Sequence, residues 1–126
     1  MDKNALISYW VESANRDYQT MLNLYQSKDY HWSLFIGHLV IEKLIKAIYV
    51  NNINEYPPRT HDLVRLTEKA GIATTEDQKD TLDLLTTFNI KVRYPDYEFI
   101  FYRKCDYDFT TEILKKSMRL GYGFYQ

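Results

Sequence analysis

The sequence predicts an all-α protein, an antiparallel helical bundle of four to five helices that forms one domain over residues 1–126. Two observations point to this fold. Apolar residues recur at coiled-coil-like spacing near the start of the chain, and residues 34–50 are apolar on almost every side when arranged as a helix. Helix breakers at Pro57, Gly71 and Pro95 then divide the remainder into shorter helical pieces.

The first two helices are predicted to be long. Apolar residues at intervals of four and three predict a helix from about Asn4 to Ser27, with one face made of Ile7, Val11, Ala14, Tyr18, Met21 and Tyr25. Asp29 is a suitable N-cap for a second helix that runs to about Asn52. The short link between them predicts an antiparallel hairpin, and the apolar second helix should be the buried centre of the domain.

Two shorter helices should follow the prolines. Thr60 is a plausible N-cap for a helix from His61 to about Ala70, which Gly71 would end. Thr75 and Gln78 have the spacing of a capping box, which predicts the start of the next helix.

Pro95 should end that helix, because a proline disfavours helical geometry at the residue before it, Tyr94. The aromatic segment Asp96–Cys105 is rich in β-prone residues without a partner strand, so a loop or a single helical turn is expected there. A last helix is predicted from Asp106 or Asp108 to about Leu120.

Composition excludes several classes of protein. The 16 basic and 17 acidic residues nearly cancel, so the chain is not a general nucleic-acid binder. Cys105 is the single cysteine and cannot form an internal disulfide. The sequence shows no signal peptide and no membrane span, and a cytoplasmic location is expected.

Tyrosine is unusually frequent, with 12 residues, and half of all aromatic residues lie from Tyr94 onward. Tyrosine is enriched at interfaces, which favours a packing or dimer surface near the C-terminus. The alternative is a tyrosine-rich composition without functional meaning.

The chain resembles the HEPN family (higher eukaryote and prokaryote nucleotide-binding domains). The resemblance depends on four motifs in order, which are Trp10-x3-Ala14-x2-Asp17, Tyr30 followed by His38-x3-Glu42-Lys43-x2-Lys46-Ala47, Thr60-His61-Asp62-Leu63, and Arg93-Tyr94-Pro95-Asp96. The last resembles the RYPD ending of one bacterial branch. The resemblance implies a four- to five-helix bundle, usually dimeric, whose bacterial members are often encoded beside a minimal nucleotidyltransferase in a two-component, toxin–antitoxin-like pair.

Other members of that family are metal-independent ribonucleases with an arginine followed four to six residues later by a histidine. Here no histidine follows His61, and Arg59 precedes it by only two residues. The ribonuclease motif is therefore absent, which favours a protein that is not an enzyme.

The middle of the second helix carries the first candidate site residues. His38, Glu42 and Lys46 are spaced four apart and form one stripe, with Lys43 beside it. Lys46 could bind a phosphate or pair with Glu42, and these alternatives are evenly balanced. Lys43 is expected to reach solvent. His38 could be a general base, but a core histidine is the more common role.

Further candidates lie at the ends of two shorter helices. His61 could attract an anion at a helix N-terminus, whereas Asp62 would cap that helix. Arg93 could clasp a phosphate, although an ion pair with Asp96, Asp62 or Glu42, or capping of helix carbonyls, is favoured. No metal-ligand spacing and no cofactor motif are found.

The leading hypothesis is a non-catalytic HEPN homodimer that binds a nucleotide or similar anion, or a nucleotidyltransferase partner. The cleft would be lined by the second helix, the third helix and the end of the fourth. Lys46, His61 and Arg93 would supply positive charge, Tyr94 a stacking surface, and Glu42 and Asp96 support. The alternatives are a ribonuclease with a variant site, in which Arg93 meets His38 or His61, and a pure assembly protein without a small ligand.

Overall fold

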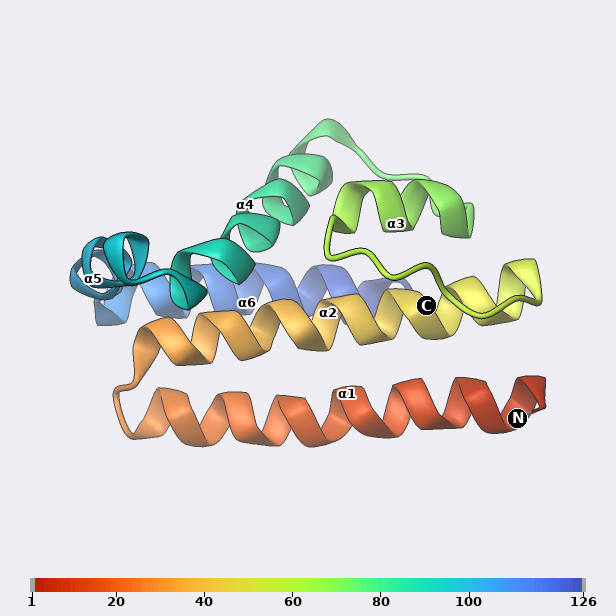
Figure 1. Cartoon of the computed structure of the whole chain (residues 1–126), viewed down its shortest axis with the longest axis horizontal. Coiled ribbons are helices and arrows are strands. Elements are labelled where there is room, and N and C mark those ends of the chain that lie inside the picture. The colour runs from red at the N-terminus through yellow and green to blue at the C-terminus, as the bar shows by residue number, and fades with distance from the viewer. Residues whose placement is uncertain (1, 126) are drawn as a thin grey trace.

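The computed structural model describes residues 2–125 and contains six helices within them, with no strand. Helices α1 (Lys3–Gln26) and α2 (Tyr30–Ile53) form a long antiparallel hairpin along one side of the molecule (Figure 1). Helices α3 (Leu63–Ala70) and α4 (Glu76–Arg93) cross above α2, and α6 (Tyr107–Gly123) lies behind it. The short helix α5 (Pro95–Lys104) lies at the end of the bundle that is far from the N-terminus.

Helix α2 is the centre of the fold, as predicted, because it packs against each of the other five helices. Its fully buried apolar side chains include Leu34, Val40, Ile41 and Ile45. A second, smaller cluster joins the two ends of the hairpin, where Leu6 and Trp10 of α1 pack against Ala47 and Val50 of α2. Burial of this helix on most sides explains why its sequence is mainly apolar.

Local capping signals account for most helix boundaries. The capping box at Thr75 and Gln78 is present, with both reciprocal hydrogen bonds formed. Asp106 caps α6 by accepting a hydrogen bond from the Phe109 amide. Asp29 is the N-cap of α2 but its side chain does not cap the helix, because it accepts a hydrogen bond from the Ser27 hydroxyl.

The predicted start of α3 was wrong by two residues. Asp62, not Thr60, is the N-cap, since its carboxylate accepts from the Arg65 amide at 3.2 Å. The Thr60 hydroxyl instead accepts from the Asp62 amide. The backbone at His61 stays outside the helix, where its carbonyl bonds to a side chain of α2.

The expected loop at 96–105 was also wrong, because this segment is α5, and the described residues therefore hold six helices instead of four to five. Pro95 occupies the first helical turn, where its fixed φ suits the helix and its missing N–H costs nothing. Acidic residues in the first turn and basic residues in the last turn complement the helix dipole. Phe101 anchors the helix by stacking on Phe88 of α4, with the ring centroids 4.9 Å apart.

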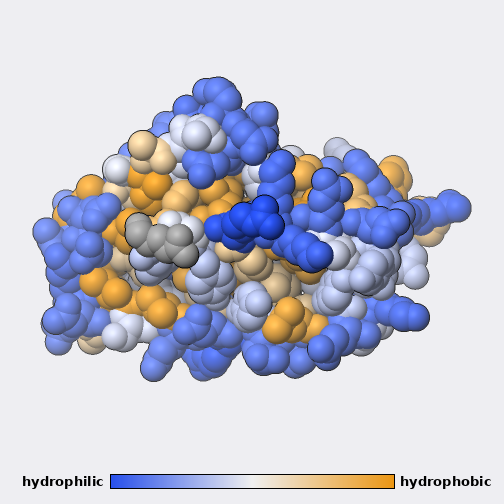
Figure 2. Space-filling model, turned by 180° about the vertical axis from the view of Figure 1, so that it is seen from behind, coloured by the Kyte–Doolittle hydropathy of each residue, from blue (hydrophilic) through white to orange (hydrophobic). Residues whose placement is uncertain are grey.

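None of the helices in the described part of the chain is both long enough and apolar enough to cross a membrane. Seen from behind, the molecule exposes hydrophobic residues between hydrophilic ones on the face formed by α1 and α6 (Figure 2). A cavity of about 240 Å³ lies between these two helices and is lined mainly by Tyr18, Met21, Leu22, Tyr25, Leu114 and Met118.

Candidate functional site

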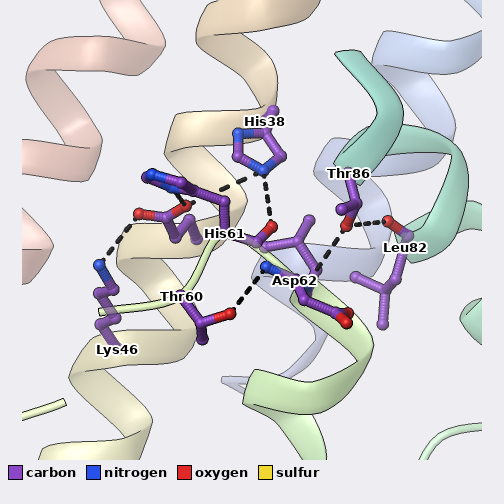
Figure 3. Close-up of polar contacts among 9 residues, drawn as sticks. His38, Lys46, Thr60, His61, Asp62, Leu82 and Thr86 are labelled. Atoms are coloured by element: carbon purple, nitrogen blue, oxygen red, sulfur yellow. Dashed lines mark hydrogen bonds and ion pairs between the residues drawn. The ribbon is translucent and has the colours of Figure 1, made fainter. Parts of the chain in front are cut away.

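The predicted stripe on α2 forms the inner part of a polar network. His38, Glu42 and Lys46 are all buried in the described structure, with exposed fractions of 0%, 4% and 9%. Buried charges and imidazoles must be paired, and each of these side chains has a polar contact (Figure 3).

Glu42 is the hub of this network. One carboxylate oxygen accepts a hydrogen bond from Nδ1 of His61 at 2.8 Å. The other oxygen accepts from Nζ of Lys46 at 3.0 Å. Nε2 of His38 lies 3.9 Å from the first oxygen, so three side chains with possible positive charge surround a single carboxylate.

The pairing alternative for Lys46 is present in the structure. Lys46 pairs with Glu42 one turn away, and its ammonium lies 5.0 Å from the centre of the Trp10 ring on α1. An ammonium held between a carboxylate and an aromatic face is satisfied within the protein. Lys46 therefore forms the ion pair with Glu42 that the i,i+4 spacing predicted.

His38 occupies the core beneath His61. Its Nε2–H donates to the main-chain carbonyl of His61 at 3.2 Å, and the two imidazole rings lie 6.2 Å apart. Burial lowers the pKa of His38 below its ordinary value of 6.5, and the nearby charges of His61 and Arg93 act in the same direction. The hydrogen bond to His61 and the charge of Glu42 oppose that lowering without overcoming it.

The neutral form of His38 leaves Nδ1 as an acceptor, and this buried nitrogen finds no donor among the described residues. His38 is thus a core residue, as favoured from the sequence, but one that is incompletely satisfied.

His61 links this network to the surface. Its side chain is 51% exposed, while its Nδ1–H is fixed by Glu42. That hydrogen bond fixes the orientation of the ring, and Nε2 has no partner among the described residues. The arrangement presents an oriented imidazole at the surface.

Arg93 and Tyr94 lie at the end of α4 and are both exposed. The ion pair expected between Arg93 and Asp96, Asp62 or Glu42 is not formed, and Arg93 has no side-chain hydrogen bond within the described part of the chain. Its charge nevertheless lies close enough to His38 to affect the pKa of that imidazole. Arg93 on α4 and His61, which precedes α3, therefore both lower the pKa of His38 through their charges.

Two other predicted residues have structural roles. Asp62 caps α3, as favoured from the sequence, and its side chain is directed along that helix. Lys43 does not simply extend into solvent, because its Nζ contacts a carboxylate oxygen of Asp17 on α1 at 2.6 Å. Asp96 is exposed on α5 and makes no ion pair with the described residues.

The sequence reasoning missed the contributions of Trp10 and Asp17 to this region. In an antiparallel hairpin, residues about equally far from the turn face each other, and the turn here is at Lys28. Trp10 and Lys46 form such a pair, so the spacing contained the signal. Among the described residues, no group of three or more His, Cys, Asp or Glu side chains could hold a metal ion.

A comparison with known protein families identifies one family for this chain. The model of the HEPN domain matches residues 7–120, which is most of the chain. The chain belongs to the HEPN domain family. No curated protein and no solved structure matches this HEPN chain.

Proposed function

We propose that this HEPN protein binds a nucleotide or a similar anionic small molecule without transforming it, at the surface formed by His61, Arg93 and Tyr94. The observation that supports this most directly is the exposed Arg93, a guanidinium with no carboxylate partner among the described residues. A free guanidinium can bind a phosphate through two parallel hydrogen bonds.

The neighbouring side chains suit the rest of such a ligand. Tyr94 is 55% exposed and could stack on a base. His61 is held by Glu42, so the entropy of orienting its imidazole is not lost again upon binding. Lys46, His38 and Glu42 would support the site from beneath, and the ligand would contact only the outer residues.

A thermal-shift screen against mono-, di- and trinucleotides tests this proposal. A ligand at a hundred times its dissociation constant should stabilise the protein by about 2.7 kcal/mol. The shift should be lost in Arg93→Ala and reduced in Tyr94→Ala. Arg65→Ala is the matched control, because Arg65 is an exposed arginine on α3. A nucleotide shift that persists in Arg93→Ala, or no shift with any nucleotide, would refute binding at this surface.

A second function, RNA cleavage by a variant site, is favoured by one observation. The carboxylate-oriented imidazole of His61 and the charge of Arg93, which acts on neighbouring His38, could supply a base and a charge for phosphoryl transfer. RNA cleavage that survives repurification and disappears in both Arg93→Ala and His61→Gln would support it. Cleavage that persists in those variants would be a contaminant.

We also propose that the protein acts as a homodimer in the cytoplasm and as a partner of a minimal nucleotidyltransferase. The support for self-association is the distribution of exposed large hydrophobic residues, because seven of the twelve in the described part of the chain lie from Ile90 to Tyr107. Large exposed hydrophobic patches on a single chain are typical of interaction surfaces. Co-expression with a nucleotidyltransferase encoded beside this gene, followed by co-purification, tests the second partner.

A further inference from the structure

Helix α5 exposes a stripe of side chains that reads acidic, apolar, apolar, basic. Asp96, Phe99, Ile100 and Arg103 follow one another at helical spacings of three, one and three, so they share one face. Phe99 and Ile100 are 60% and 67% exposed, which makes them among the most exposed large hydrophobic residues described. The opposite face of α5 carries Phe101, which is buried against α4.

Two contacts show which side chains lie on this outer face and which lie on the other side of α5. The guanidinium of Arg103 lies 5.6 Å from the centre of the Phe99 ring, so both side chains lie on the outer surface. Glu98 points the other way, where a carboxylate oxygen lies 3.1 Å from Nε2 of His31 on α2. Asp96 makes no ion pair with the described residues, so it supplies a negative charge at one end of the stripe, and Arg103 supplies a positive charge at the other.

A stripe of this kind is complementary to itself. When two copies of α5 pack antiparallel about a two-fold axis between Phe99 and Ile100, Phe99 of one copy faces Ile100 of the other. The same operation sets Asp96 of each copy opposite Arg103 of its mate. A parallel arrangement would instead place like charges together, which is unfavourable.

We propose that α5 is the homodimer contact of this protein and that its occupant is α5 of a second copy, in antiparallel orientation. This inference deepens the homodimer proposed above and does not depend on the nucleotide. Helix α5 lies at the end of the bundle that is far from the N-terminus (Figure 1).

Tyr97 flanks the stripe and is 57% exposed, so it could extend the contact. Together with Phe99 and Ile100 it could bury roughly 400 Å² per copy, about half of the ~800 Å² of a standard interface. A reversible dimer, instead of a permanent one, is the result expected from such an area.

Sedimentation equilibrium of the full chain, with charge-reversed variants, tests the pairing. Wild type should dimerise reversibly. Asp96→Arg and Arg103→Asp should each weaken the dimer by about tenfold or more, because each places two like charges opposite one another. The double variant D96R/R103D should regain dimerisation, since the charges are again complementary.

Two further variants keep the test decisive. Asp83→Arg reverses an exposed charge on α4 and should leave the dimer unchanged. Ile100→Glu leaves both helix ends intact and should also weaken the dimer, and circular dichroism checks that each variant is folded. A monomeric wild type, a dimer indifferent to these changes, or a double variant that fails to recover would overturn the proposal. A monomeric variant that still binds nucleotide would show that the ligand site does not depend on the dimer.

Discussion

Glu42 and His61 are joined by a hydrogen bond of 2.8 Å between a carboxylate that is almost fully buried and an imidazole that is half exposed. This contact connects the core of α2 to the surface where α3 begins. The buried carboxylate of Glu42 therefore fixes the orientation of the exposed His61 imidazole. Substitutions at buried positions should therefore affect stability and the candidate ligand site together.

Glu42→Gln should destabilise the protein strongly. The change removes the charge that compensates Lys46, which is 9% exposed, and an unpaired buried charge costs about 3–5 kcal/mol. Urea unfolding measures the loss. The double variant Glu42→Gln with Lys46→Met removes both charges and should cost less than the sum of the single variants. A cost within about 0.5 kcal/mol for Glu42→Gln, as for a surface change, would show that the pair is not buried in solution.

Stability should fall as the pH drops below about 6.5. Burial lowers the pKa of His38 in the folded state, so the unfolded chain takes up a proton at a higher pH than the folded chain does. More protons on the unfolded state mean that stability rises with pH in the window between the folded pKa and 6.5. It is lost progressively as the pH falls through that window.

The matched variant for this effect is His38→Gln, whose side-chain amide can still donate to the His61 carbonyl but does not titrate. Melting temperatures of both proteins between about pH 7 and pH 5 give the comparison, in which other titrating groups contribute equally. The wild type should lose more stability across this range than the variant. Parallel curves for the two proteins would mean that His38 accepts a proton as readily when folded as when unfolded.

Ile41→Asp should leave the chain unfolded. Ile41 is fully buried in the main core, and a carboxylate introduced there would have no partner. Ile53→Asp on the same helix is the control, because Ile53 is 38% exposed and should tolerate the charge. Circular dichroism of both purified variants distinguishes them. An Ile41→Asp variant that melts like wild type would show that α2 is not the buried centre of the fold.

The helices that the sequence predicts well are those marked by local signals. The apolar spacing of α1, the uniformly apolar α2 and the capping box at Thr75 depend only on neighbouring residues. Helix α5 also has local signals, in Pro95 and in its oppositely charged ends, but the aromatic run between them favoured an extended segment. The segment is a helix in which Phe101 is buried against Phe88, and a tertiary contact of this kind cannot be read from a sequence pattern.

The candidate site was predictable to the same extent. The i,i+4 spacing identified His38, Glu42 and Lys46 as one stripe, and two of the contacts within it are present. The approach of His61 to Glu42 depends on how the chain after α2 returns across that helix. Its carbonyl is held by His38, which also explains why α3 begins later than the capping signal at Thr60 implied.

The close packing of α6 on α2 at Gly121 gives the last prediction. A Cβ atom added at Gly121 would lie 2.3 Å from Cδ1 of Ile41 and 3.3 Å from Cδ1 of Leu44, so an alanine cannot fit unless these side chains move. Overpacking of this kind costs about 1–3 kcal/mol, against which alanine gains up to ~1 kcal/mol over glycine within a helix.

Gly121→Ala should therefore be destabilising overall, by an amount that Ile41→Val reduces, because valine lacks the Cδ1 atom that the new methyl group meets. The quantity to measure is the coupling energy from urea unfolding of the two single variants and the double variant. Since the residues touch, the double variant should be more stable than additivity implies. Gly123→Ala is the control on the same helix, because a Cβ there meets no atom within 4 Å. Additive behaviour would show that α6 packs less tightly on α2 than the structure indicates.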